Sequence, residues 1–313
     1  MLSRVADALY WMARYLERGE HTARLVAVKL ESMVEQTRED ADASWHRVVE
    51  AVSGEEFAPR AHDAFSITQA LAFNRHNPSS LISSLRFARD NARQVREHLS
   101  TEVWEHLNKL YLRLQPVTAD AVWRHSPERV FREALEDFHT LHGVILSTLT
   151  HNEGYHFLRL GRYIERAQLI SHLLDLHFNS RPGAVSPRYF DWLVLLKFCC
   201  AFEPYSRAYT ASIRPEKIAQ FLIFDPEFPH SVRFAVDQVV DSLSRVAPAA
   251  PPARRANVER LAGRLKAAVD FGQVEDLMGG TIVGFLADIT RQCEQIHDAV
   301  HVSYISYGAE TVL

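Results

Sequence analysis

Hydrophobic positions at the start of the chain repeat with the period of an α-helix. They recur three or four residues apart through most of the first segment: Val5, Leu9, Met12, Leu16, Ala23, Ala27 and Leu30. This spacing puts them on one helix face and predicts a long helix that begins after Ser3 and runs to about Glu39. Later segments keep the helical period, and none shows the two-residue alternation of a β-strand. The pattern therefore predicts an all-α fold.

Prolines and capping residues predict where the later helices begin. The predicted starts are Asn77-Pro78, Ser126-Pro127, Arg214-Pro215 and Phe228-Pro229. Proline is favoured in the first turn of a helix, so Asn77 is expected to be the N-cap of the helix that follows it. A further helix is predicted at residues 44–53. The proline-rich run at 247–252 predicts a stiff, extended connector.

Two sequence motifs occur twice, at nearly the same offset. Ala13-Arg14-Tyr15-Leu16-Glu17-Arg18 returns 148 positions later as Gly161-Arg162-Tyr163-Ile164-Glu165-Arg166. A second motif, with Asn74, Pro78 and Ser80, returns 151 positions later with Asp225, Pro229 and Ser231. The repeats predict two pseudo-repeated helical units, residues 1–150 and 151–313, packed as one bundle-like body.

The charged residues of the first motif are candidates for a binding site. They are Arg14, Glu17 and Arg18 in the first copy and Arg162, Glu165 and Arg166 in the second. In each copy their spacing brings the side chains together along one helix. Two interpretations stay open: salt bridges between helices, or a pocket in which guanidinium groups hold an anionic substrate or partner and Glu acts as acid, base or orienting group. In both cases Glu17 and Glu165 are expected to be buried and paired with arginine.

Three other polar pairs lie near these motifs. Asn77 and Ser79 surround the first turn of a predicted helix, where backbone N–H groups cap the helix or bind an anion. The pairs Glu20-x-x-x-Arg24 and Glu17-x-x-x-His21 are interpreted as a solvated helix face.

A di-metal site is the alternative chemistry. Glu136-x-x-His139 and Glu294-x-x-His297, together with Glu17 and Glu165, match the ligand inventory of a di-iron helical bundle. The pattern is not specific, however, because four of the 16 histidines have Glu three residues before them. We therefore expect no metal and no cofactor, with the two histidines in separate places.

Composition and charge exclude several classes of protein. The formal charge of −4 gives no electrostatic reason to expect nucleic acid as a partner. The three cysteines, Cys199, Cys200 and Cys293, form neither a disulfide framework nor a zinc-binding spacing. The N-terminus lacks the apolar run of a signal peptide, and the longest apolar stretch is too short to span a membrane. These features predict a soluble cytoplasmic protein.

Several segments resemble the bacterial alpha-E domain family over nearly the whole chain. They include the opening Leu2-Ser3-Arg4-Val5-Ala6-Asp7, the two Arg-Tyr-x-Glu-Arg motifs, Asn77-Pro78-Ser79-Ser80, Ala88-Arg89-Asp90-Asn91-Ala92-Arg93 and Trp104-Glu105. The chain departs from the family pattern at His21 and at His230, where the family often has Asn and Arg.

The resemblance implies an all-helical protein that acts beside, or fused to, a circularly permuted ATP-grasp ligase. Transglutaminase-like peptidases are often neighbours of such proteins. The resemblance therefore implies an accessory or partner subunit of a system that forms peptide or amide bonds. A helical-bundle enzyme in the same pathway is the alternative.

Overall fold

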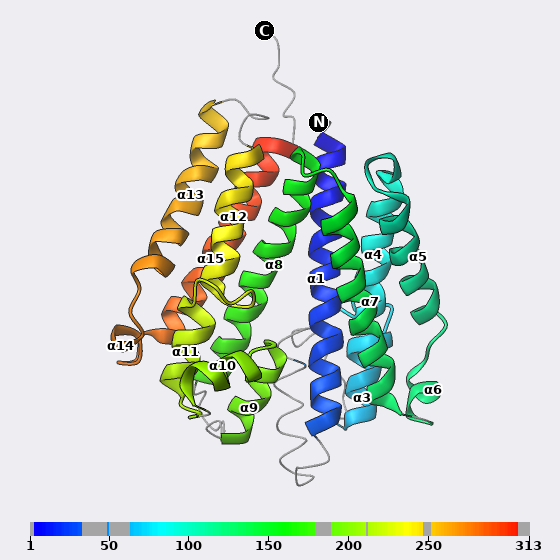
Figure 1. Cartoon of the computed structure of the whole chain (residues 1–313), viewed down its shortest axis with the longest axis horizontal. Helices are drawn as coiled ribbons and strands as arrows, with labels where there is room; N and C mark the ends of the chain where they lie inside the picture. The colour runs from blue at the N-terminus through cyan, green and yellow to red at the C-terminus, as the bar shows by residue number, and fades with distance from the viewer. Residues whose placement is uncertain are drawn as a thin grey trace. The chain divides into compact units, whose positions relative to one another are not determined.

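The computed structural model describes residues 3–32, 49, 63–124, 126–179, 189–210, 212–246 and 252–305. All regular structure in these residues is helical (Figure 1), which confirms the predicted all-α fold. The helix predicted at residues 44–53, apart from residue 49, and the proline-rich run at 247–251 lie outside the described residues.

The chain divides into two compact units that draw on separate segments. One unit, which we call the α8 unit, comprises Met1–Arg14, Thr150–Ala184 and Tyr205–Leu313. The other, the α7 unit, comprises Tyr15–Leu149 and Val185–Pro204. The predicted boundary at residue 150 separates two repeats that were inferred from the repeated sequence motifs. This division into repeats stays a prediction.

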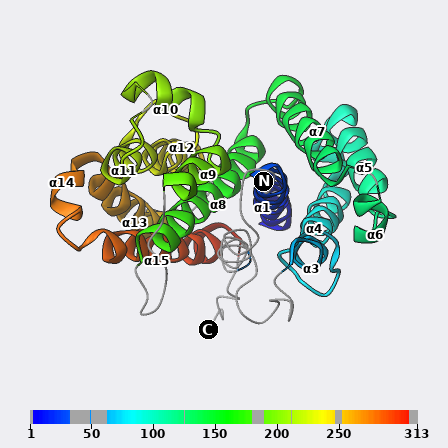
Figure 2. The same cartoon turned by 90° about the horizontal axis from the view of Figure 1, so that it is seen from below.

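In the α8 unit, α8 (Glu153–Phe178) packs along α12 (Val232–Val246) and α15 (Ile282–Val300). Helix α13 (Pro252–Phe271) packs against both α12 and α15, as Figures 1 and 2 show. The smaller elements are α11 (Pro215–Phe224), α14 (Val274–Leu277), the π-helix η6 (His301–Ile305) and the part of α10 (Phe202–Tyr209) from Tyr205 onward.

In the α7 unit, α5 (Thr101–Leu114) packs against α4 (Leu81–Gln94) and α7 (Pro127–Thr148). The remaining elements are short: α3 (Ala64–Thr68), η3 (Gln69–Phe73), η4 (Arg96–His98), α6 (Ala119–Trp123) and α9 (Tyr189–Phe198).

Helix α1 (Ser3–Ser32) contributes residues to both units. Its predicted hydrophobic stripe is buried, with Met12 and Ala23 completely inaccessible to solvent. Burying a large apolar side chain contributes about 1.5–3 kcal/mol relative to leaving it exposed. The polar flank of this stripe is buried as well, since Glu20 and Arg24 are 3% and 8% exposed. The prediction that this pair lies on a solvated face is therefore wrong.

Two predicted helix starts are wrong by three residues. Helix α4 begins at Leu81 and α12 at Val232, so neither Pro78 nor Pro229 occupies the first helical turn. Ser80 is the N-cap of α4, and its hydroxyl accepts a hydrogen bond from the Ser83 amide at 3.3 Å. A serine hydroxyl satisfies the free amides of a first turn, which explains why the helix starts there. The starts of α7 at Pro127 and α11 at Pro215 agree with the prediction.

Helices α1 and α8 approach each other closely at Gly161. A β-carbon added at Gly161 would overlap the carbonyl oxygen of Tyr10 and lie 3.0 Å from its carbonyl carbon. The side chain of Arg14 would be 3.3 Å away. The absence of a side chain at residue 161 is therefore what brings α8 against the α1 backbone.

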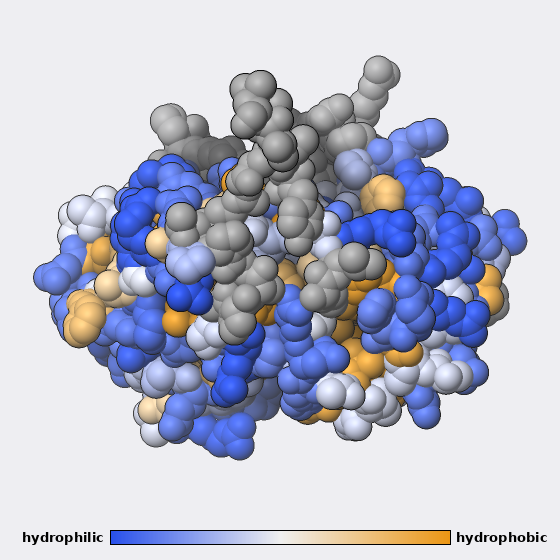
Figure 3. All heavy atoms as spheres, turned by 90° about the horizontal axis from the view of Figure 1, so that it is seen from above, coloured by the Kyte–Doolittle hydropathy of each residue, from blue (hydrophilic) through white to orange (hydrophobic). Residues whose placement is uncertain are grey.

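The visible surface of the described residues is mostly hydrophilic, with small hydrophobic areas between polar ones (Figure 3). Isolated exposed apolar residues of this kind are normal for a folded protein. Among the described helices, none has the length and apolar content needed to cross a bilayer.

Candidate functional site

The first motif places a buried ion pair between α1 and α8. The Nε of Arg14 donates to Oε2 of Glu165 at 2.6 Å, and the Nη2 donates to the side-chain oxygen of Gln168 at 2.8 Å. Arg14 is 6% exposed and Glu165 is 3% exposed. Burial acts to lower the pKa of the Arg14 guanidinium, but the Glu165 carboxylate outweighs burial and raises it. The expected burial and arginine pairing of Glu165 are thus observed.

Aromatic residues of α1 and a histidine of α15 surround the Arg14 guanidinium. Its central carbon lies 5.8 Å from the Tyr10 ring centre and 5.1 Å from that of Trp11. The Tyr10 hydroxyl and Nδ1 of His297 are hydrogen-bonded at 2.9 Å, and the two rings are parallel. Burial, followed by the positive charge of Arg14, lowers the pKa of His297 to about 4. His297 is therefore neutral at neutral pH.

The low pKa of His297 predicts a specific loss of stability in acid. An unfolded histidine has a pKa of about 6.5, so between this value and about 4 the unfolded chain binds the extra proton. The free energy of unfolding should therefore fall as pH drops through this window. We expect the melting temperature of His297→Gln to depend less steeply on pH there than that of the wild type. His76→Gln, at an exposed position, is the control; equal slopes for wild type and His297→Gln would contradict the prediction.

The second arginine of each motif stacks on the tyrosine three residues before it. The Arg18 guanidinium lies 5.5 Å from the Tyr15 ring centre, and that of Arg166 lies 5.3 Å from the Tyr163 ring centre. Arg166 is buried, and its Nη1 donates to the Pro229 carbonyl at 3.0 Å.

The remaining two motif residues differ in their surroundings. Arg162 is half-buried, with its guanidinium 5.8 Å from the Tyr163 ring centre. Glu17 is 4% exposed, as expected, and its carboxylate lies near Glu20 and His142 in the α7 unit. Its pairing with an arginine stays a prediction. A ligand-binding role for the six motif residues also stays a prediction.

Asn77 and Ser79 take part in local turn contacts. The Asn77 Oδ1 accepts from the Ser79 amide at 2.9 Å, and its Nδ2 donates to the Ala70 carbonyl at 3.1 Å. Asn77 is completely buried. These contacts hold the turn between η3 and α4.

The two copies of the second motif make the same side-chain contacts with the backbone. The side chains of Asn74 and Asp225 each accept from the amide two residues later, at 3.0 and 2.9 Å. The hydroxyls of Ser80 and Ser231 each accept from the amide three residues later, at 3.3 and 3.0 Å. The local geometry agrees with the predicted repeat, while the duplication of the whole halves stays a prediction.

The six residues of the di-metal alternative do not form one cluster among the described residues. Glu165 is bound to Arg14, and His297 contacts Tyr10, both in the α8 unit. His139 lies in the α7 unit, where its Nε2 is 3.1 Å from Arg24 Nη2.

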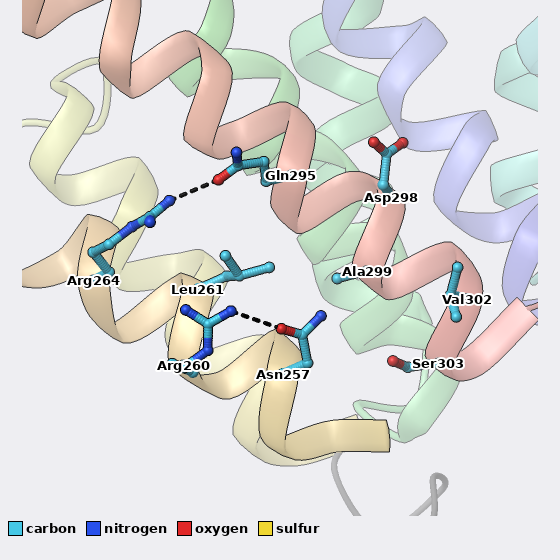
Figure 4. A pocket seen from close by; sticks show the side chains of 9 residues that line it. All are labelled: Asn257, Arg260, Leu261, Arg264, Gln295, Asp298, Ala299, Val302 and Ser303. Atoms are coloured by element: carbon cyan, nitrogen blue, oxygen red, sulfur yellow. Dashed lines mark hydrogen bonds between the residues drawn. The ribbon is translucent and has the colours of Figure 1, made fainter. Parts of the chain in front are cut away.

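A groove of about 560 Å³ lies in the α8 unit between α13 and the end of α15 (Figure 4). Its side chains are those of Asn257, Arg260, Leu261, Arg264, Gln295, Asp298, Ala299, Val302 and Ser303. Arg260 and Arg264 are exposed on the same face of α13. Two cations and one carboxylate give the lining a positive balance.

Neutral amides orient both groove arginines. The Nη2 of Arg260 donates to Asn257 Oδ1 at 2.9 Å. Arg264 donates from Nε to Gln292 Oε1 at 3.0 Å and from Nη2 to Gln295 Oε1 at 2.6 Å. Amide oxygens hold the guanidinium groups without neutralising their charge, so the groove is suited to a carboxylate or a phosphate.

The groove arginines were not among the residues selected from sequence. One signal could have identified them: Arg260 and Arg264 are one helical turn apart, with no acidic residue three or four positions from either. A helical arginine pair without an i,i+4 acidic partner has no intrahelical ion pair to neutralise it.

Together, the helical bundle and its buried Arg–Glu motif define an all-helical protein of the kind described as a predicted alpha-helical domain with a conserved ER motif. The chain belongs to this family, Alpha-E, which it matches over residues 1–305. Each of the two repeated Arg-Tyr-x-Glu-Arg motifs ends in a Glu-Arg pair, Glu17-Arg18 and Glu165-Arg166.

Curated relatives come from mycobacteria. An uncharacterized protein of Mycobacterium bovis is 24% identical over 319 residues, covering 94% of this chain. An uncharacterized protein of Mycobacterium tuberculosis H37Rv is 23% identical over the same length. The chain spans 35% of the length of each of these relatives. No solved structure matches the chain.

Proposed function

We propose that this chain is an accessory subunit of an ATP-grasp system that forms peptide or amide bonds, and that it binds the anionic peptide substrate. The observation that carries the proposal is the groove between α13 and α15. There Arg260 and Arg264 are exposed, and amide oxygens hold them in place. A carboxylate accepts paired hydrogen bonds from a guanidinium, so a peptide with acidic side chains or a free C-terminus fits this lining.

The length of the mycobacterial relatives supports action together with other domains. The region similar to this chain makes up 35% of each relative, so the rest of the polypeptide lies outside the matched region. We infer that this domain works beside a catalytic partner, in the same polypeptide or as a separate subunit. We propose a circularly permuted ATP-grasp ligase as that partner, and a transglutaminase-like peptidase as a further neighbour, since the resemblance to the alpha-E family implies both.

The Arg-Tyr-x-Glu-Arg motifs have a supporting role in this proposal. Arg14 and Arg166 are buried and bonded to Glu165 and to the Pro229 carbonyl. These bonds fix α8 against α1 and against the turn before α12. Since α15 packs on α8, the motif stabilises the body that carries the groove.

The groove predicts binding of an acidic peptide. We expect a fluorescently labelled oligoglutamate to bind the isolated chain, with an affinity that falls as salt is added. Replacing both Arg260 and Arg264 by Gln should weaken binding about 100- to 10,000-fold, because hydrogen bonds to charged groups contribute about 1.5–3 kcal/mol each and two such groups are lost. Arg291→Gln on α15 is the control, because that arginine is exposed but paired with Asp288. If wild type and the double variant bind oligoglutamate with equal affinity, the groove is not the peptide-binding site.

Co-expression and activity assays test the role as a partner subunit separately from peptide binding. The chain should co-purify with a circularly permuted ATP-grasp ligase from the same genome when the two are expressed together. The isolated chain should hydrolyse neither ATP nor amides. Robust turnover by the isolated chain would favour the alternative, a helical-bundle enzyme of the same pathway.

A further inference from the structure

Two pairs of potential metal ligands face each other in the α7 unit. Glu17 and Glu20 lie three residues apart on α1, and His139 and His142 lie three residues apart on α7. Side chains three residues apart project from the same side of a helix. Each helix therefore presents a pair of ligand-bearing side chains to the other.

The atoms of three of these residues are already close enough to share an ion. The carboxylate oxygens of Glu17 and Glu20 and a ring nitrogen of His142 all lie within 4.8 Å of one another. Glu20 Oε2 is 2.9 Å from His142 Nε2, and Glu20 Oε1 is 3.5 Å from His139 Nε2. Ligand atoms on a tetrahedral zinc ion are about 3.4 Å apart, given bonds of about 2.0–2.2 Å. Small side-chain rotations would bring the three groups to that spacing.

The cluster is buried but reaches solvent at one point. The side chains of Glu20 and His142 are 4% and 12% exposed, whereas that of His139 is 58% exposed. Burial acts to raise the pKa of Glu20, but hydrogen bonds from His139 and His142 and the charge of Arg24 hold it well below its usual value.

A glycine next to the acidic pair positions the two helices. A β-carbon on Gly19 would lie 3.1 Å from Cζ of Phe138, which immediately precedes His139. The small residue lets α7 pack closely enough on α1 for the two imidazole rings to reach Glu20.

We propose that Glu17, Glu20 and His142 bind a divalent first-row transition-metal ion such as zinc. His139, on the exposed side, supplies a fourth ligand and the path of entry. The mixture of carboxylate oxygen and imidazole nitrogen fits Zn²⁺, Mn²⁺ or Fe²⁺, whereas Mg²⁺ and Ca²⁺ favour oxygen ligands alone. This site uses His139 and Glu17 but is otherwise different from the di-metal arrangement considered from sequence.

Arg24 competes with the ion for one side of the site. Its Nη2 is 2.5 Å from Glu20 Oε1 and 3.1 Å from His139 Nε2. The other oxygen of Glu20 faces His142, so three ligands can assemble while Arg24 remains on Oε1. His139 can bind the ion only if Arg24 moves away. Arg24 is therefore expected to weaken metal binding.

Zinc titration of untagged, chelator-treated protein tests the proposal. We expect one Zn²⁺ per chain by native mass spectrometry, micromolar or tighter binding by calorimetry, and visible absorption bands when Co²⁺ replaces zinc. Glu17→Gln, Glu20→Gln and His142→Asn should each weaken zinc binding at least tenfold. Glu136 is an exposed acidic residue on the same face of α7, three residues before His139. Glu136→Gln should leave the zinc affinity unchanged.

Arg24→Met separates a metal site from a purely structural ion-pair cluster. Removal of the competing guanidinium should raise zinc affinity several-fold, an effect that an ion-pair cluster would not produce. The wild-type stoichiometry and Co²⁺ spectrum do not depend on any variant being folded. Absence of binding to the wild type at 100 μM zinc, about a hundredfold above a micromolar dissociation constant, would overturn the proposal. Equal binding by wild type and Glu20→Gln would overturn it too.

Discussion

Replacing Gly161 by alanine is expected to lower the free energy of unfolding by about 3 kcal/mol, the upper end of the usual cost of overpacking. The added methyl group would overlap the Tyr10 carbonyl oxygen, which belongs to the backbone of α1. A backbone atom inside a helix cannot rotate away as a side chain can, so the two helices must separate. Separation would also lengthen the bonds of Arg14 to Glu165 and Gln168.

Thermal unfolding of Gly161→Ala and Gly263→Ala provides a matched comparison. Gly263 lies on α13 in the same unit, and a β-carbon there would meet nothing within 4 Å. Alanine is favoured over glycine in helices by about 1 kcal/mol, so Gly263→Ala should stabilise the protein slightly. A wild-type melting temperature for Gly161→Ala would show that α1 and α8 are not in backbone contact.

Glu165→Gln is expected to destabilise the protein by about 3 kcal/mol, the lower end of the cost of breaking a buried ion pair. The neutral amide can still accept a hydrogen bond, but the Arg14 guanidinium, 6% exposed, would lose the charge that compensates for its burial. The loss should appear as a lower midpoint in urea denaturation with little change in slope.

A double variant distinguishes the ion pair from simple packing. Replacing Arg14 by Met and Glu165 by Leu together should recover much of the lost stability, because no buried charge is left without its partner. Asp90→Asn, in the exposed pair with Arg93, should change stability by less than about 0.5 kcal/mol. Additive effects of the two single substitutions at 14 and 165 would mean that the residues do not interact.

The sequence predicted the helices well because their signals are local. A stripe such as Met12, Leu16 and Ala23 and a proline at Pro127 act within a few turns of one helix. The repeated motif also led to Glu165, whose burial next to Arg14 is observed. The predicted starts of α4 and α12 are wrong because two helix-start signals, a proline and a serine two residues later, compete at each position. The serine is the cap that the backbone uses.

The features that the sequence could not predict depend on contacts between helices that are far apart in the chain. The pair Glu20 and Arg24 has the spacing of a solvated surface pair, yet α7 covers it. The contact relies on a small residue, Gly19, and on a partner more than a hundred positions away, Phe138. The groove arginines are likewise defined by α15, whose Gln292 and Gln295 orient Arg264. Periodicity along one helix contains no information about these neighbours.

The amide contacts of Arg264 have a kinetic consequence. A guanidinium held by two glutamine oxygens is ordered before any ligand arrives, so less side-chain freedom is lost on association. Its undiminished charge attracts an anionic chain from a distance of about one Debye length, roughly 8 Å at physiological salt. Encounter with an acidic peptide would then be fast and sensitive to ionic strength, and differences among peptides would lie chiefly in how long each stays bound. Such a groove is suited to brief, repeated capture of a growing or changing chain.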